Sequence, residues 1–296
     1  MNRNASFLDE LAEGSFLLDG AMGSSLLATG DIEMGEVALA VIRHPERVRE
    51  IHRSFLDAGS RWLLTHTFGA NACAVEANAS GLSVERLNSL AVKLARDEAS
   101  AVPGTWVAGN IGPASLWLPK EARPELAELR GVYDEQAAAL ANAGVDLFCL
   151  ETFGGSGEAL IAMQALERYS LPIVASLTFT QQRGEYQTLE GGPLLAALQE
   201  LEAGGAAAVG INCAGGSAQV LECARHMIGH VDVPFFAKPN AGKPVPRGKG
   251  TAYLQDRAEF ASHMQQAVEL GVAAVGGCCG ADSSYIASLG RALRGA

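Results

Sequence analysis

Two adjacent cysteines, Cys278 and Cys279, stand between glycines near the C-terminus, where a short apolar run ends. Neighbouring side chains on a strand point to opposite faces, so both sulfurs can reach one ion only if the strand ends there and the backbone turns sharply. Gly276, Gly277 and Gly280 permit such a turn, because glycine adopts backbone angles that other residues avoid. The pair therefore predicts two ligands of a zinc ion, which thiolates bind at about 2.3 Å.

A third thiolate could come from Cys213, which ends another apolar run. A single cysteine is more often a small buried hydrophobe than a metal ligand, so this alternative stays open on local sequence alone. Three protein ligands on tetrahedral zinc leave one position open, which is typical of a catalytic site. Three thiolates would leave such a site with a negative charge, which suits the binding of a substrate thiol better than the formation of hydroxide.

Composition limits the classes of protein. The 296 residues are 48% hydrophobic and 19% charged, which favours a large buried core over disorder. A net charge of −11 argues against nucleic-acid partners. No apolar run approaches the roughly 18 residues of a membrane span, and the N-terminus lacks the apolar core of a signal peptide. Six cysteines in so long a chain do not resemble a secreted disulfide scaffold, so we expect a cytoplasmic protein without membrane association.

Short apolar runs alternate with longer helical patterns along the whole chain, and eight such units favour one closed (β/α)8 TIM barrel over residues 1–296. The alternative is an open doubly wound sheet, but no Gly-x-Gly-x-x-Gly fingerprint follows the first run. Long irregular loops are expected at 31–44, 181–192 and 240–250. The expected strands are 16–20, 62–68, 106–110, 146–152, 172–177, 207–213, 234–239 and 272–277, and the expected helices are 45–58, 84–99, 125–143, 156–167, 193–203, 217–228, 256–270 and 283–294.

A barrel brings the C-terminal ends of its strands to one face, where active sites form. Cys213, Cys278 and Cys279 would then meet, as would Asp19 and Glu151 at the ends of strands one and four. The two carboxylates could hold an ammonium group; the alternative for each is a turn cap or a buried ion pair. The backbone N–H groups of residues 20–23 could take a carboxylate. Thiol, ammonium and carboxylate together describe a thiol amino acid.

Other candidate ligands fit this face less well. Cys149 lies inside a strand, and Cys73 and Cys223 lie in helical or loop segments, so we interpret all three as structural. His66 could line the barrel or be a hydrogen-bonded core residue. Three other histidines, His226, His230 and His263, lie on or just after expected helices and are expected to be exposed. Trp62 and Trp106 start strands and are interpreted as packing residues.

Seven motifs resemble the homocysteine S-methyltransferase family, in the order of that family and over nearly the whole chain. The resemblance implies a zinc-bearing (β/α)8 barrel that methylates homocysteine, with Cys213, Cys278 and Cys279 as zinc ligands. It places Asp19 and Glu151 at positions that contact the homocysteine amino group and Asn240 near the substrate, while Gly20 and Ala21 are expected to bind the substrate through their backbone N–H groups. The motifs are LDGAMG at 18–23, THTFGAN at 65–71, GNIGP at 109–113, ET at 151–152, GINC at 210–213, PNAG at 239–242 and GGCCG at 276–280.

The first two motifs most resemble the homocysteine module of cobalamin-dependent methionine synthase, whereas residues 281–284 depart from the Thr-Thr-Pro usual after the cysteine pair. The expected reaction is methyl transfer to homocysteine, giving methionine. The donor is either a small onium compound, favoured by Glu33, Glu36, Glu185 and Glu190 in the expected loops, or a methylated corrinoid protein. No folate, cobalamin or activation module is expected within the chain. The alternatives are methylation of another thiol, and a zinc- or thiol-binding module without turnover.

Overall fold

The computed structural model describes residues 3–14, 16–78, 81–119, 125–247 and 250–295. Its centre is a parallel eight-stranded sheet in the order β1-β12-β9-β8-β5-β4-β3-β2. A parallel bridge between Leu18 and Trp62 joins the two end strands, which closes the barrel. The strands are β1 (Phe16–Leu17), β2 (Trp62–Leu64), β3 (Trp106–Ile111), β4 (Leu147–Phe153), β5 (Ile173–Leu177), β8 (Ala208–Gly216), β9 (Phe235–Asn240) and β12 (Ala274–Val275).

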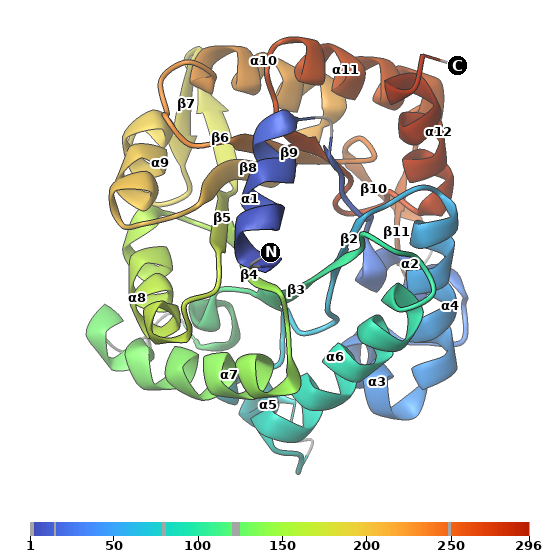
Figure 1. Ribbon diagram of the computed structural model, residues 1–296, viewed down its shortest axis with the longest axis vertical. Helices are drawn as coiled ribbons and strands as arrows, with labels where there is room; N and C mark the ends of the chain where they lie inside the picture. Colours follow the sequence, from blue (N-terminus) through green and yellow to red (C-terminus); the bar gives the residue numbers. More distant parts are fainter. Residues whose placement is uncertain (1–2, 15, 79–80, 120–124, 248–249, 296) are drawn as a thin grey trace.

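Helices surround the barrel and cover the outer face of its strands (Figure 1). The predicted (β/α)8 architecture is confirmed, and most predicted helix ends agree with the structure within a few residues. After α1 (Arg3–Glu13), the α-helices are α2 (Met22–Ala28), α3 (Ala40–Arg43), α4 (Pro45–Asp57), α5 (Ala72–Ala77), α6 (Val84–Ala99), α7 (Arg130–Ala143), α8 (Ser156–Leu166), α9 (Leu194–Ala203), α10 (Ser217–Met227), α11 (Arg257–Glu269) and α12 (Ser283–Leu293). The 3-10 segments are η1 (Met34–Leu39), η2 (Ala114–Trp117), η4 (Leu126–Leu129) and η5 (Glu167–Tyr169).

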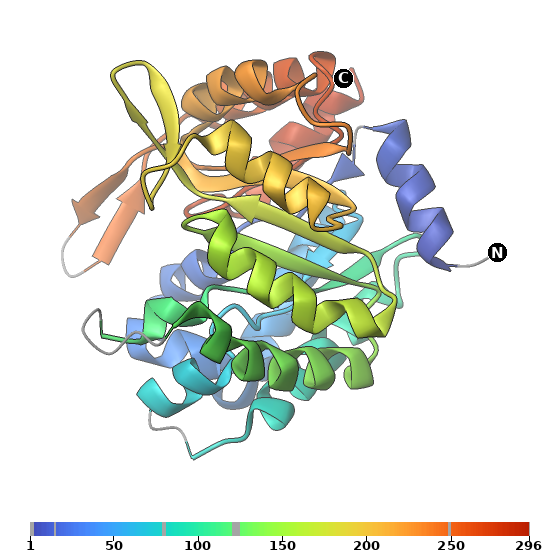
Figure 2. The same ribbon diagram turned by 90° about the vertical axis from the view of Figure 1, so that its left-hand side faces the viewer.

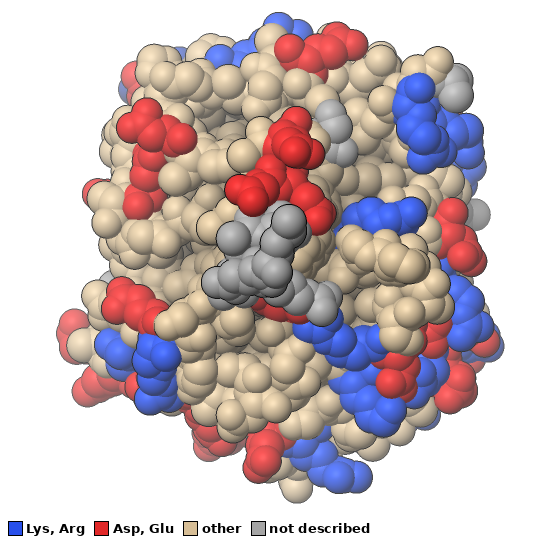
Figure 3. Space-filling view, in the orientation of Figure 1, with Lys and Arg blue, Asp and Glu red and all other residues tan. Residues whose placement is uncertain are grey.

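An additional helix, α1 (Arg3–Glu13), lies across the amino-terminal mouth of the barrel (Figures 1 and 2). Its Phe7 and Leu11 are buried, and the Phe7 ring meets the rings of Trp62 and Trp106 edge to face. The two tryptophans are therefore packing residues, as predicted. Acidic side chains gather over this helix on the outside (Figure 3). Since α1 covers the amino-terminal mouth, the opposite end of the barrel is the one left for a site.

Two hairpins replace irregular loops that the sequence predicted. The expected loop 181–192 contains β7 (Glu185–Thr188) and the end of its partner β6 (Phe179–Gln182). The expected loop 240–250 contains β10 (Pro244–Arg247), which pairs with β11 (Gly250–Tyr253). Polar residues and glycines dominate both segments, so sequence periodicity did not reveal them. Both hairpins extend from the same side of the molecule (Figure 2).

The core has an inner part and an outer part. Inside the barrel, a cluster near α1 contains Cys149, which is 1% exposed. The larger outer cluster lies between strands and helices and contains Cys223, which is fully buried. Both cysteines are therefore core residues, as predicted. Among the described residues, no helix has the length and apolar character needed to cross a membrane.

Candidate metal and substrate site

Three cysteine sulfurs meet at the carboxyl ends of the strands. Cys213 lies in β8, and Cys278 and Cys279 follow β12. Their sulfur atoms all lie within 4.8 Å of one another, and Cys213 Sγ is 3.5 Å from Cys279 Sγ. All three residues are partly exposed rather than sealed in the core. The predicted convergence of these three thiols is therefore present in the structure.

Backbone distortion directs the sulfurs into this arrangement. Cys213 has φ 56°, a left-handed conformation that is rare for residues other than glycine. It lies where the pairing register between β8 and β9 shifts, between Asn212 and Gly216. Strain of this kind persists only where the surrounding structure enforces it, and it concentrates at functional sites.

Hydrogen bonds to β9 hold the turn that carries the cysteine pair. The Cys278 N–H donates to the Pro239 carbonyl at 2.7 Å, and the Ala241 N–H donates to the Cys279 carbonyl at 2.9 Å. Gly280 follows with φ +81°, and a Cβ there would lie 2.2 Å from the ring of Tyr253. Glycine is therefore required at position 280 both by conformation and by space.

The three thiols form a donor set that fits a soft divalent cation. Hydrogen bonds from Cys213 and Cys278 lower the pKa of Cys279 to about 3. Hydrogen bonds with Cys213 and Cys279, and then burial, raise the pKa of Cys278 well above its usual range. The cluster therefore stabilises a thiolate on Cys279. Thiolate ligands in this number and spacing favour zinc over the harder cations, which prefer oxygen.

Asn212 supports the cluster from behind, a role that sequence reasoning did not assign. Its Oδ1 accepts hydrogen bonds from the Thr152 N–H at 2.8 Å and the Ser176 hydroxyl at 2.9 Å. Its Nδ2 donates to Thr152 Oγ1 at 2.7 Å and lies 3.8 Å from Cys278 Sγ. Asn212 thus links the ends of β4 and β5 to a candidate metal ligand. The only signal in the sequence was its place beside Cys213 in the GINC motif.

Asp19 and Glu151 lie near each other, but a lysine lies between them. Lys238 Nζ is 3.3 Å from Asp19 Oδ1 and 3.6 Å from Glu151 Oε2. Asp19 is 2% exposed, and its Oδ2 accepts a hydrogen bond from the Leu64 N–H at 2.7 Å. Burial raises the pKa of Asp19 to about 6, although Lys238 opposes this shift. The buried ion pair that the sequence left as an alternative is therefore present for both carboxylates, with Lys238 as the unpredicted partner.

The glycine and alanine after Asp19 contribute packing. The Ala21 N–H donates to the Ala281 carbonyl at 2.9 Å, so it is already occupied. A Cβ at Gly20 would lie 2.2 Å from the same carbonyl oxygen, which explains why glycine stands there. The prediction that this N–H of Ala21 takes a substrate carboxylate is therefore not supported by the geometry, and binding by the neighbouring N–H groups stays a prediction.

Asn240 at the end of β9 lies beside the cysteine cluster. It is 6% exposed, and its Nδ2 donates to the Cys213 carbonyl at 3.4 Å. Its Oδ1 is buried and has no hydrogen-bond partner among the described residues. A buried acceptor without a partner costs free energy unless a bound molecule satisfies it. A place for Asn240 near the substrate stays a prediction.

Tyr253, at the end of β11, was also missed by sequence reasoning. Its ring lies against Gly280, directly after the cysteine pair. Burial and then the Cys279 sulfur raise the pKa of its hydroxyl above the usual range. The hairpin β10–β11 therefore brings an aromatic hydroxyl to the edge of the cluster.

The histidines lie apart from the cysteine cluster. His66 Nε2 is 2.6 Å from the Val37 carbonyl, which ties the end of β2 to η1. His226 and His230 are exposed as predicted, whereas His263 is only partly exposed because its Nδ1 lies 2.8 Å from the Ser217 hydroxyl. Among the described residues, the three cysteines are the only cluster of three potential ligands with metal-binding spacing.

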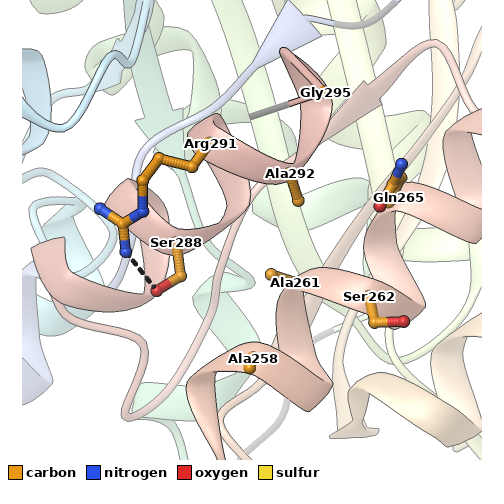
Figure 4. A pocket seen from close by; sticks show the side chains of 8 residues that line it. All are labelled: Ala258, Ala261, Ser262, Gln265, Ser288, Arg291, Ala292 and Gly295. Carbon is orange, nitrogen blue, oxygen red and sulfur yellow. Dashed lines mark hydrogen bonds between the residues drawn. The ribbon is translucent and has the colours of Figure 1, made fainter.

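A surface groove elsewhere on the molecule does not belong to this site. It lies between the outer helices α11 and α12 and is lined mainly by small side chains (Figure 4). Arg291 donates a hydrogen bond to the Ser288 hydroxyl at 3.0 Å along its wall. The lining residues are Ala258, Ala261, Ser262, Gln265, Ser288, Arg291, Ala292 and Gly295.

The fold and the site define a (β/α)8 barrel with a candidate three-cysteine metal site at its carboxyl end. Residues 16–293 match the family described as homocysteine S-methyltransferase, so the chain belongs to this family. The resemblance seen in the sequence motifs is thereby confirmed.

The relatives include proteins longer than this chain and proteins of similar length. The methionine synthases of Mycobacterium tuberculosis and Mycobacterium leprae are 29% and 28% identical, and each match covers 98% of this chain. The chain spans about a quarter, 25%, of the length of these two relatives. The metallated form of the homocysteine methyltransferase MmuM from Escherichia coli is 25% identical, with a TM-score of 0.80 over 98% of this chain and 99% of that chain.

Proposed function

We propose that this barrel is a zinc-dependent homocysteine S-methyltransferase that produces methionine from homocysteine and a methyl donor. The observation that carries the proposal is the meeting of Cys213, Cys278 and Cys279 within 4.8 Å at the open end of the barrel. Family membership and the E. coli relative support homocysteine as the methyl acceptor. All six cysteines are free in the structure, which agrees with action in a reducing cytoplasm.

The residues present fit a zinc ion through three thiolates, with one position left for a substrate thiol. Zinc bound there would favour the thiolate form of homocysteine, which is the nucleophilic form. Asn212 would hold the orientation of Cys278 through the hydrogen bonds described above. Partners behind a ligand of this kind commonly tune metal affinity.

Glu151 is the carboxylate best placed to bind the homocysteine ammonium. Its side chain is 12% exposed, compared with 3% for that of Asp19. Asn110 Nδ2 donates to Glu151 Oε1 at 2.6 Å, which fixes the carboxylate in orientation. Thr152, the next residue, bonds to Asn212 and so lies beside the metal ligands. Substrate thiol and ammonium would thus be held from β8, β12 and β4 at once, and such positioning lowers the entropic barrier to reaction.

For the methyl donor we propose a small onium compound, because the chain carries a net charge of −11. However, ion pairs already neutralise part of the negative charge in the segment around residues 31–44. Glu36 pairs with Arg43 at 3.0 Å, and Asp31 pairs with Arg47 at 3.6 Å. The donor preference therefore depends on acidic residues such as Glu185, which is exposed on its hairpin.

A methylated corrinoid protein is the second candidate donor, and several exposed apolar side chains favour it. In the described part of the chain, four large apolar side chains are more than half exposed, and each lies in a segment that follows a barrel strand. Such segments lie at the carboxyl end of the barrel. Exposed apolar patches commonly mark protein contacts. The four residues are Met34 (71%), Leu116 (55%), Leu189 (62%) and Leu254 (71%).

A donor panel tests the proposal. Zinc-loaded protein is incubated with homocysteine and, separately, S-methylmethionine, betaine, S-adenosylmethionine or methylcobalamin, and methionine is measured. We expect methionine with an onium donor and none with the Cys213→Ser variant. Formation only with the methylated corrinoid would refute the charge-based preference while leaving the methyltransferase proposal intact.

The same assay separates the alternative functions. Replacing homocysteine by cysteine or 2-mercaptoethanol tests methylation of a different thiol. Zinc binding without methylation of any thiol by any donor would instead indicate a zinc- or thiol-binding module without turnover.

A further inference from the structure

Two strands of the barrel contain a residue other than glycine in the left-handed conformation. Thr152 in β4 has φ 66°, and Cys213 in β8 has φ 56°. Each lies where the pairing register of its strand shifts, and the shift in β4 falls between Leu150 and Phe153. The left-handed conformation is especially unfavourable for a β-branched residue such as threonine. Because such strain persists only where the surrounding structure enforces it, the contacts of Thr152 must hold it there.

Thr152 holds the side chain of Asn212 by two hydrogen bonds. Its backbone N–H donates to Asn212 Oδ1 at 2.8 Å, and its Oγ1 accepts from Asn212 Nδ2 at 2.7 Å. The hydroxyl of Ser176 in β5 donates to the same Oδ1 at 2.9 Å. Since β5 lies between β8 and β4 in the sheet, these bonds join three strands near their carboxyl ends.

These contacts decide which end of the Asn212 amide faces the cysteine cluster. A backbone N–H can only donate, so the atom that the Thr152 N–H meets must be the amide oxygen. The amide nitrogen is then left to donate to Thr152 Oγ1 and to face Cys278 Sγ at 3.8 Å. If the amide were turned over, a thiolate on Cys278 would face an acceptor instead of a donor.

The left-handed residue gives up a regular strand contact for this bond. In a parallel sheet the N–H of a strand residue normally bonds to the adjacent strand. The N–H of Thr152 instead bonds to a side chain that comes from β8, two strands away. Asn212 is fully buried, so its amide would be left with unsatisfied polar atoms without these partners.

We propose that Thr152 is a positioning residue of the metal site, which acts through Asn212 to keep a hydrogen-bond donor against the Cys278 sulfur. The proposal rests on the proposed function, because it takes the cysteine cluster as a zinc site. Groups behind a metal ligand fix its orientation and tune metal affinity. The geometry extends this support by one residue, from Asn212 to Thr152.

A cycle of single and double variants tests whether Thr152 acts through Asn212. Thr152→Val keeps the branched shape and the backbone N–H but removes the hydroxyl. We expect its zinc affinity, measured on the full chain by competition with a chromophoric chelator, to fall roughly tenfold. In Thr152→Val/Asn212→Ala we expect the affinity of Asn212→Ala alone, because two residues that act through the same contact do not have additive effects.

Cobalt(II) in place of zinc gives a second readout, which a purely structural role would not change. In Thr152→Val the sulfur-to-cobalt charge-transfer band should move to lower energy, because a thiolate that loses a hydrogen bond donates electrons more easily. The melting temperature of the metal-free protein is measured beside it. A fall in melting temperature with an unchanged band and unchanged zinc affinity would show that Thr152 supports only the fold, and would overturn the proposal.

Two variants serve as controls. Thr152→Ser keeps the hydroxyl and should have nearly the zinc affinity and cobalt spectrum of the wild type. Ser170 also has a left-handed conformation, with φ 51°, but it ends η5 before β5 begins, at the amino-terminal end of the barrel. Ser170→Gly should therefore change neither metal measurement. If Thr152→Val does not fold, Thr152→Ala replaces it, since alanine also lacks the hydroxyl.

Wild-type zinc affinity in a folded Thr152→Val variant would overturn the proposal, and so would losses that add up in the double variant. Failure of the wild-type protein to bind zinc would instead contradict the proposed function, and this proposal with it. The role of Thr152 and the proposed function therefore fail in distinguishable ways.

Discussion

Asn212 Nδ2 lies 3.8 Å from Cys278 Sγ, while Asn212 Oδ1 accepts two hydrogen bonds from β4 and β5. The amide thus connects a candidate metal ligand to a rigid part of the barrel wall. Its side chain is fully buried, so its orientation is fixed by these partners.

Replacing this amide should weaken metal binding without removing a ligand. For Asn212→Ala we expect zinc affinity to fall about 10–100-fold, the usual effect of losing a partner behind a metal ligand. Competition with a chromophoric chelator measures the affinity. Asn88→Ala, which removes a buried amide that bonds to Ala70 and Val84 on the outer layer, is the control. Equal affinity in both variants would show that Asn212 only supports the fold.

Cys213→Ser should abolish most zinc binding and all methyl transfer, because it removes one of three converging sulfurs. The expected wild-type content is about one zinc per chain. Cys223→Ser, in the outer core, is the control and should retain the metal. Elemental analysis of the purified variants measures the zinc content of each. Full zinc content in Cys213→Ser would exclude Cys213 as a ligand.

Removal of zinc should leave the barrel folded. Most of the hydrophobic core lies between strands and helices and inside the barrel near α1, and only its edge reaches the cysteine cluster. A chain with so large a core does not depend on a metal to fold, unlike a zinc finger. Chelation should therefore abolish activity while the far-UV circular dichroism stays native. Cooperative loss of helix signal on mild chelation would contradict this expectation.

Glu151→Gln should weaken homocysteine binding and leave zinc content unchanged. A hydrogen bond to a charged group contributes roughly 1.5–3 kcal/mol against about 1 kcal/mol for a neutral one, which predicts a loss of several-fold to tens-fold in affinity. Calorimetry with homocysteine measures it, and 4-mercaptobutanoate serves as the control ligand because it lacks the amino group. The same loss for both ligands would assign Glu151 a structural role.

Acid should destabilise the protein through His52. This residue of α4 is fully buried, and neither ring nitrogen has a hydrogen-bond partner among the described residues. Burial, assisted by His66, lowers the pKa of His52 to about 3 from 6.5. Between these values the unfolded chain binds a proton that the folded chain does not, so the free energy of unfolding falls by about 1.4 kcal/mol for each unit that pH drops below 6.5.

Denaturant unfolding of wild type and His52→Leu at pH 7 and pH 5 tests this linkage. The variant should lose less stability between the two pH values than the wild type. His230→Gln, at an exposed position, should behave as the wild type does. Equal pH dependence of wild type and His52→Leu would mean that His52 is not buried in its neutral form.

The sequence alone determined the architecture and the convergence of the three candidate metal ligands. Eight apolar strands that alternate with amphipathic helices can pack in only a few architectures. One of them, the closed parallel barrel, brings the carboxyl ends of all strands to one face. Given that constraint, Cys213 and the cysteine pair had to approach each other despite their distance in the chain. The two hairpins were not predicted, because their polar strands carry no periodicity that distinguishes them from loops.

Only the tertiary structure decided the charge relationships in the site. Lys238 lies in an apolar strand with no local signal of its partners, and its contacts depend on the distance across the barrel from β9 to β1 and β4. The same holds for Asn212, whose partners come from neighbouring strands, and for Tyr253, which a hairpin brings to Gly280. Sequence patterns report which face a residue occupies, whereas the ionic and hydrogen-bond partners of a buried polar group are fixed by the packing of distant segments.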